Sequence, residues 1–196
     1  MSATISSINY CPVKSISFQA IEKCKIKKNV GIVGDRIFAF AKDLDLEQTK
    51  LFEKSPAQRK GKWNKVLTLK NSPALNKYNF IFKDEKLTLK LKDNEILSID
   101  INQSSEREAL SNKISELESS LKQPITLIKN IDFPFFDTSI SKKVDFENSI
   151  SLLNTQSIND FENKVNKKIE TSIFRGTSRC STSKYCSTSG NRFMVQ

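Results

Sequence analysis

Short β-prone segments recur through the first 102 residues, and their regular spacing constrains the fold more than any other feature of the chain. The clearest is 86–92, where leucines alternate with lysines and a threonine, as in a half-buried antiparallel strand. Further strands are predicted at 5–10, 16–26, 36–41, 66–69, 78–82 and 97–101. Seven or so short strands are typical of a sandwich or a barrel. We therefore expect a β-barrel-like or sandwich-like N-terminal domain.

The apolar period changes after residue 102. Four residues recur at spacings of four, three and four, which places them on one face of a helix: Leu110, Ile114, Leu117 and Leu121. A capping-box candidate at 105–108 and the later Pro124 bound this helix. A second helix, capped by Asn154 or Thr155, carries its own apolar face: Ile158, Phe161, Val165 and Ile169. The fold class is therefore predicted as mainly β with α, that is α+β.

The remaining segments are predicted from local composition. The segment 48–62 is polar and contains Pro56 and Gly61, which indicates a loop with at most one helical turn. Short strands are expected at 125–128 and 149–153, with a loop at 132–143 between them. The segment 176–191 is rich in Ser, Thr, Cys and Gly and lacks the apolar residues needed to join a core, so we expect it to be disordered or loosely attached.

The net charge of +10 invites a nucleic-acid or membrane partner. The excess is mostly lysine spread along the chain, while arginine, which reads base edges, is scarce. We therefore favour solvated lysines, with no specific nucleic acid as partner. A basic protein that binds nucleic acid non-specifically remains an alternative.

Histidine is absent, which excludes His-based catalytic triads and His-ligated metal sites. The four cysteines, in a chain without an N-terminal export signal, indicate reduced thiols and a cytoplasmic protein. Cys11 and Cys24 lie among strand residues and are expected to be small buried side chains. No apolar run approaches the length of a membrane helix, so no membrane partner is expected.

Two short motifs place polar side chains at turns around predicted strands. The segment 10–15 ends in Lys14 and Ser15, and the segment 31–36 ends in Asp35 and Arg36. A lysine, an arginine and a hydroxyl can form charge-assisted bonds to a phosphate. These residues are a candidate seat for an anionic group. Alternatively, Asp35 and Arg36 form a structural ion pair and Ser15 is a turn hydroxyl.

The motifs Tyr-Cys-Pro-Val-Lys-Ser at 10–15 and Gly-Ile-Val-Gly-Asp-Arg at 31–36 resemble the N-terminal β-barrel region of MOSC-domain proteins. The later stretches Asn-Thr-Gln-Ser at 154–157 and Phe-Arg at 174–175 are similar to the start of the MOSC domain itself. The resemblance covers about 4–175. It implies an N-terminal domain at 1–128, an incomplete MOSC barrel at 129–175 and an aberrant or disordered tail at 176–196.

The resemblance implies binding of a molybdenum cofactor of the molybdopterin type, as in amidoxime-reducing enzymes and molybdenum cofactor sulfurase. Pyridoxal phosphate binding is also associated with such proteins. The implied cofactor-binding residues are Lys14, Ser15, Arg36, Thr155, Ser157 and Arg175. Cys180 is the implied metal ligand and catalytic residue, since thiolates suit a thiophilic metal. The implied activity is sulfur transfer or reduction of N-hydroxylated substrates, with a ferredoxin or flavoprotein as electron donor.

The chain departs from the family pattern after Phe174 and Arg175. Several expected strands are missing before the Arg-Cys pair at 179–180. A shifted or truncated reading frame accounts for the tail, and an internal deletion that keeps Cys180 as a ligand is the alternative. A second hypothesis for the whole chain is therefore a non-catalytic remnant, or binding module, that retains only the anion seat.

Overall fold

The computed structural model describes residues 4–16, 18–27, 30–59, 61–121, 123–136 and 150–170, and the backbone of 178–181. The chain divides into two compact units. The larger unit takes its described residues from 10–20 and 24–149, and the smaller unit from 1–9, 21–23 and 150–196. Each unit is described by itself.

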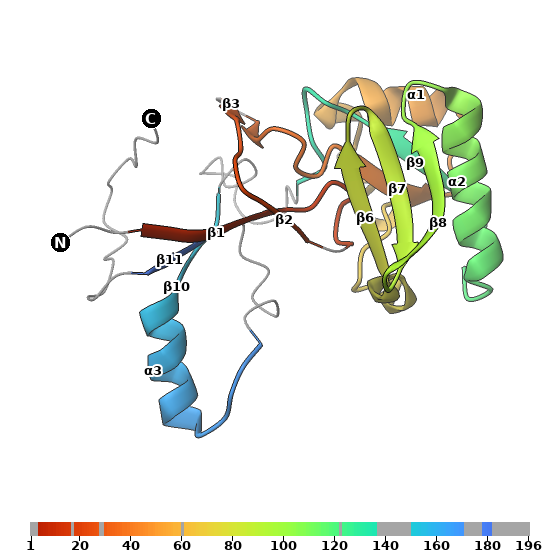
Figure 1. Ribbon diagram of the computed structural model, residues 1–196. Helices are drawn as coiled ribbons and strands as arrows, with labels where there is room; N and C mark the ends of the chain where they lie inside the picture. Colours follow the sequence, from red (N-terminus) through yellow and green to blue (C-terminus); the bar gives the residue numbers. More distant parts are fainter. Residues whose placement is uncertain are drawn as a thin grey trace. The chain divides into compact units, whose positions relative to one another are not determined.

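The larger unit contains an antiparallel sheet of three strands in the order β6, β7, β8, with bounds Tyr78–Lys83, Lys86–Leu91 and Asn94–Asp100. These strands confirm the prediction from alternating residues. The inward side chains Phe80, Leu87 and Leu89 are buried. Helix α2, Ser104–Leu117, follows β8 and buries Leu110 and Ile114 in the same core, and Figure 1 shows the helix beside β8. The sequence predicted this helix from apolar residues spaced four, three and four positions apart.

Strand β5, Phe38–Lys42, pairs antiparallel with β9, Ile125–Lys129. Alternate residues of β5 enter two different hydrophobic clusters: Phe38 and Phe40 join the main core, while Ala39 and Ala41 join a second cluster around Phe52. Burial on both faces explains why this segment is continuously apolar in sequence.

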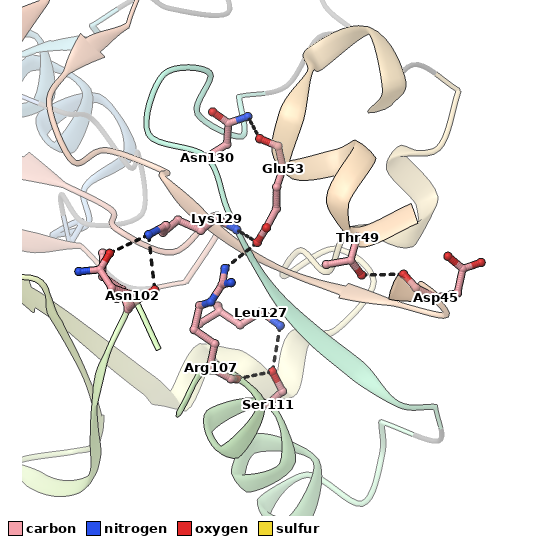
Figure 2. A network of polar contacts seen from close by, with 10 residues as sticks. Asp45, Thr49, Glu53, Asn102, Arg107, Ser111, Leu127, Lys129 and Asn130 are labelled. Atoms are coloured by element: carbon pink, nitrogen blue, oxygen red, sulfur yellow. Dashed lines mark hydrogen bonds and ion pairs between the residues drawn. The ribbon is translucent and has the colours of Figure 1, made fainter. Parts of the chain in front are cut away.

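Side chains from two helices bind the outer edge of β9 (Figure 2). The Ser111 hydroxyl of α2 accepts a hydrogen bond from the Leu127 backbone N–H at 2.9 Å, and the Glu53 carboxylate accepts one from the Lys129 N–H at 2.8 Å. Glu53 also pairs with Arg107 at 2.7 Å. An edge strand otherwise presents unpaired backbone groups. These bonds hold β9, and with it the loop that follows toward residue 136.

The predicted loop at 48–62 is wrong, because α1 occupies Leu46–Lys54 and a 3-10 turn, η1, occupies Pro56–Arg59. Asp45 caps α1 by accepting a hydrogen bond from the Gln48 N–H at 2.7 Å. The helix buries only Phe52 completely, so its apolar pattern is too sparse to recognise. Two further 3-10 turns, η2 and η3, lie at Trp63–Lys65 and Pro73–Lys77.

Two predicted strands are also corrected. The segment 66–69 makes a single β-bridge, from Val66 to Ala41, because the chain turns back at Thr68–Asn71. The segment 16–26 is interrupted and contributes only two short strands, β2 at Gln19–Ile21 and β3 at Ile26–Lys27. Strand β3 pairs antiparallel with β4, Gly31–Ile32.

The smaller unit has a sheet that contains β10, β11 and β1 in that order. Strand β1, Thr4–Tyr10, is antiparallel to β11, Ser178–Ser181, and β11 is parallel to β10, Leu152–Asn154. Helix α3, Thr155–Val165, follows β10 directly. The segment 176–191 was predicted to be disordered or loosely attached, and the structure describes four of its residues as β11. Backbone pairing, which needs no apolar side chain, places them in the sheet.

The α+β class is confirmed, with small sheets and three helices in the described ranges. The barrel expectation is corrected, since no sheet of the described residues closes on itself. The predicted boundaries at 128 and 175 stay predictions, and 137–149, 171–177 and 182–196 lie outside the described residues. Within the described ranges, no helix combines the length and apolar character that crossing a bilayer needs.

Candidate anion-binding site

The two motifs lie side by side in the larger unit. The Arg36 N–H donates a hydrogen bond to the Cys11 carbonyl at 2.6 Å, and the Phe38 N–H donates to the Pro12 carbonyl at 3.0 Å. The Lys14 N–H returns a bond to the Phe38 carbonyl at 2.8 Å. These bonds, together with a parallel bridge between Val13 and Phe38, fix the 11–15 turn against the start of β5.

Both turns use left-handed backbone geometry. Ser15 has φ = 64° and Arg36 has φ = 53°, which is uncommon for residues other than glycine. Gly34 has φ = 92°, and a Cβ there would lie 3.2 Å from the Tyr10 ring. Residues in such conformations concentrate at functional sites, where surrounding bonds hold them.

The Asp35 carboxylate lies at the centre of this arrangement. Its Oδ1 accepts a hydrogen bond from the Cys11 N–H at 2.8 Å, and its Oδ2 pairs with the Arg36 guanidinium. Asp35 is 2% exposed. Burial raises the pKa of the Asp35 carboxyl, although the neighbouring Arg36 and Lys14 charges and the Cys11 bond act to lower it. Both cations of the predicted seat therefore act on one carboxylate.

The cations also contact aromatic rings. The Lys14 amine lies 5.2 Å from the centroid of the Trp63 ring, and the Arg36 guanidinium lies 5.2 Å from that of Phe136. Lys14 is buried, at 3% exposure, whereas the Arg36 side chain is 22% exposed. Of the two predicted cations, Arg36 is therefore the one that solvent and ligands can reach.

Arg59 holds the loop that carries Phe136. Its Nε donates to the Phe52 carbonyl at 2.9 Å, and its Nη1 donates to the carbonyls of Phe133 and Pro134 at 2.8 and 3.2 Å. Burial lowers the pKa of Arg59 to about 10, so it stays charged at neutral pH. Its guanidinium lies over the buried Phe135 ring. Phe135 is therefore fully buried in the core, while Phe133 is exposed.

The other predicted site residues belong to the smaller unit. Thr155 is the first residue of α3 and is half-buried. Ser157 is the third residue of the helix and is exposed. The Ser157 N–H donates to the Asn154 side chain at 3.2 Å, as in a helix cap. Cys180 lies in β11 opposite Ile5, and its side chain is outside the described residues, as is Arg175.

Neither Lys14 nor Arg36 lines either of two hollows in the described part of the structure. One, of about 490 Å³, is lined by Lys42, Ser72 and Leu121 among others. The second, of about 390 Å³, is mostly apolar and includes Ser157 and Phe161. The described residues hold no cluster of three or more side chains suited to bind a metal ion.

The sequence identified the cations of the seat and the neighbouring Asp35, but it missed the aromatic partners. No local pattern links Lys14 to a tryptophan 49 positions later (63 − 14). Cys11 is buried as predicted, with its Sγ 2.8 and 2.9 Å from the carbonyls of Val13 and Ile16, while Cys24 is only partly buried.

Comparison with models of known protein families, with curated proteins and with solved structures found no match to this chain. The resemblance to MOSC-domain proteins therefore stays a prediction from the motifs at 10–15 and 31–36.

Proposed function

We propose that the chain binds a phosphorylated anionic ligand at Arg36, which lies beside Asp35 in one turn and next to the second turn that contains Lys14. The observation that carries the proposal is the pairing of the two motifs, which brings a partly exposed guanidinium and a lysine to one carboxylate. Arg36 can form bidentate bonds with phosphate oxygens, and its left-handed backbone keeps it at the turn.

The MOSC resemblance makes a molybdopterin-type cofactor the first candidate ligand. The residues fit its phosphate end, because Arg36 offers a charged donor and its guanidinium lies 5.2 Å from the centroid of the Phe136 ring. At the metal end, the implied thiolate of Cys180 lies in β11, where only the backbone is described. The proposal is therefore built on the phosphate end. Sulfur transfer, or reduction with electrons from a ferredoxin or flavoprotein, belongs to the same proposal through the resemblance alone.

The direct test is binding of inorganic phosphate to the full chain, measured by titration calorimetry, with Arg36→Gln as the decisive variant. Losing a charged hydrogen-bond donor should weaken binding by about tenfold or more. Lys113→Gln is the matched control, because it removes one partly exposed cation that is paired to Glu116 on α2. Equal affinity in Arg36→Gln and the wild type contradicts the proposal.

Lys14→Met tests the contribution of the buried lysine separately from that of Arg36. The apolar chain keeps the packing against Trp63 while removing the charge, so we expect a smaller loss of phosphate affinity than in Arg36→Gln. Molybdenum and pterin content of the protein, purified from cells that make the cofactor, then tests the ligand class. Phosphate binding without pterin favours a module that recognises phosphate alone. Binding that falls steeply with salt and extends to any nucleic acid favours the non-specific alternative.

A further inference from the structure

Asp35 occupies the position that an anion bound to Arg36 must share. Its two oxygens are already used, one by the Cys11 N–H and one by the Arg36 guanidinium. While Asp35 is ionised it neutralises Arg36, and a second anion at the same guanidinium is repelled by the carboxylate a few ångströms away. Two like charges sharing one site push one of them to accept a proton.

The groups that face Asp35 from the neighbouring segments are few. Arg36 and Lys14 are cationic, and Tyr10 is neutral because burial and the Asp35 charge raise its pKa to about 12. The Cys11 thiol lies against two backbone carbonyls. The ionised form of Asp35 is thus stabilised by Lys14 and by Arg36. Arg36 is also the cation to which the incoming ligand would bind.

Burial favours the neutral form of the Asp35 carboxyl. Asp35 is 2% exposed, and desolvation already raises its pKa in the ligand-free protein. An oxyanion bound to Arg36 adds negative charge beside it and raises that pKa further. The chain contains no histidine, so no unperturbed side chain competes as the titrating group between about pH 5 and about pH 8.

We infer that Asp35 takes up one proton from solvent when an oxyanion binds to Arg36, so that the seat accepts its ligand together with a proton. This inference rests on the proposed function. It makes Asp35 the residue that sets the affinity of the seat: binding is tight when Asp35 is protonated and weak when it is ionised. Affinity should therefore fall as pH rises through the pKa of Asp35.

Sulfate is the chosen probe because its own charge does not change over this pH range. Any pH dependence of its affinity therefore comes from titration of the protein. We expect its affinity for the full chain to fall by up to about tenfold per pH unit. Calorimetry in two buffers of different ionisation enthalpy should show uptake of about one proton per sulfate on the alkaline side of the Asp35 pKa. Circular dichroism at each pH confirms that the protein stays folded.

Asp35→Asn tests the assignment. The amide keeps an oxygen for the Cys11 N–H but cannot ionise, so sulfate affinity should become independent of pH and exceed the wild type by about tenfold or more at the alkaline end. If this variant does not fold, the number of protons that the wild type takes up per sulfate still tests the inference. Sulfate binding that depends on Arg36, with constant affinity and no proton uptake, overturns the inference and leaves the proposed function standing. Failure to bind sulfate or phosphate at any pH overturns both.

Discussion

The two units treat the same kind of amphipathic helix differently. In the larger unit, Leu110 and Ile114 of α2 are completely buried against β8 and β9. In the smaller unit, α3 repeats the pattern, yet Phe161 and Val165 are 46% and 45% exposed, and Ile158 is its one buried apolar residue. A helical period therefore predicts an apolar face, while burial of that face needs other elements packed against it.

This difference bears on the candidate site. The larger unit can bury Lys14, Asp35 and Arg59 because surrounding strands and loops provide partners for each of them. In the smaller unit, Thr155 and Ser157 stand at a helix start beside a mostly apolar hollow. The larger unit is therefore the one with a preorganised arrangement of charges, which is what anion recognition requires.

The largest effect that separates the units should come from phenylalanine truncation. Phe52 is fully buried in the larger unit, so Phe52→Ala should cost about 3–5 kcal/mol of unfolding free energy. Phe161→Ala in the smaller unit removes a half-exposed ring and should cost under about 1 kcal/mol.

Urea unfolding followed by tryptophan fluorescence makes this measurement specific, because the only tryptophan, Trp63, packs on the Phe52 cluster. Far-ultraviolet circular dichroism reports both units. Equal losses from the two truncations would mean that the face of α3 is as well covered as the core, and the comparison above would be wrong.

A smaller effect is expected from a buried carboxylate in each unit. Glu118 accepts a hydrogen bond from the Tyr78 hydroxyl at 2.6 Å and pairs with Lys77. Burial raises the pKa of Glu118, but the bonds and charge of these partners outweigh burial and lower it. Stabilisation by Glu118 is thus fully present above the ordinary carboxyl pKa and is lost as pH falls through the lowered folded-state value.

Glu118→Gln should therefore cost about 1–3 kcal/mol at neutral pH and progressively less in acid, measured by urea unfolding across pH. Glu162 of α3 offers the comparison: bonds from the Ile169 N–H and from Lys168 lower its pKa. Since Lys168 is 92% exposed, Glu162→Gln should show the same direction with a smaller amplitude. A cost for Glu118→Gln that does not change with pH would show that the charge of Glu118 contributes nothing.

The smallest expected effect comes from the helix caps. Asp45 caps α1 through the Gln48 N–H, and Asn154 caps α3 through the N–H groups of Gln156 and Ser157. Each change to alanine should cost about 1 kcal/mol. The loss from Asp45→Ala should appear in unfolding of the larger unit, whereas Asn154→Ala should appear as faster amide exchange within α3. Exchange in α3 that is unchanged by Asn154→Ala would contradict this division.

The local pattern of the sequence determined those elements whose burial follows from their own periodicity. The strands β6 to β8 alternate with period two, and α2 has leucine and isoleucine at helical spacing, so both were predicted close to their observed bounds. Helix α1 was missed because Phe52 alone carries its burial, and β11 was missed because its pairing uses backbone groups only.

For the candidate site, the sequence by itself determined which charged residues stand at the two turns: Lys14, Asp35 and Arg36. Only the tertiary structure decided that Asp35 lies between the cations, that Lys14 is buried on Trp63, and that Arg36 stays accessible beside Phe136. The reason is physical. A residue's charge is a property of its side chain, whereas its desolvation and its partners depend on segments that fold beside it from distant parts of the chain.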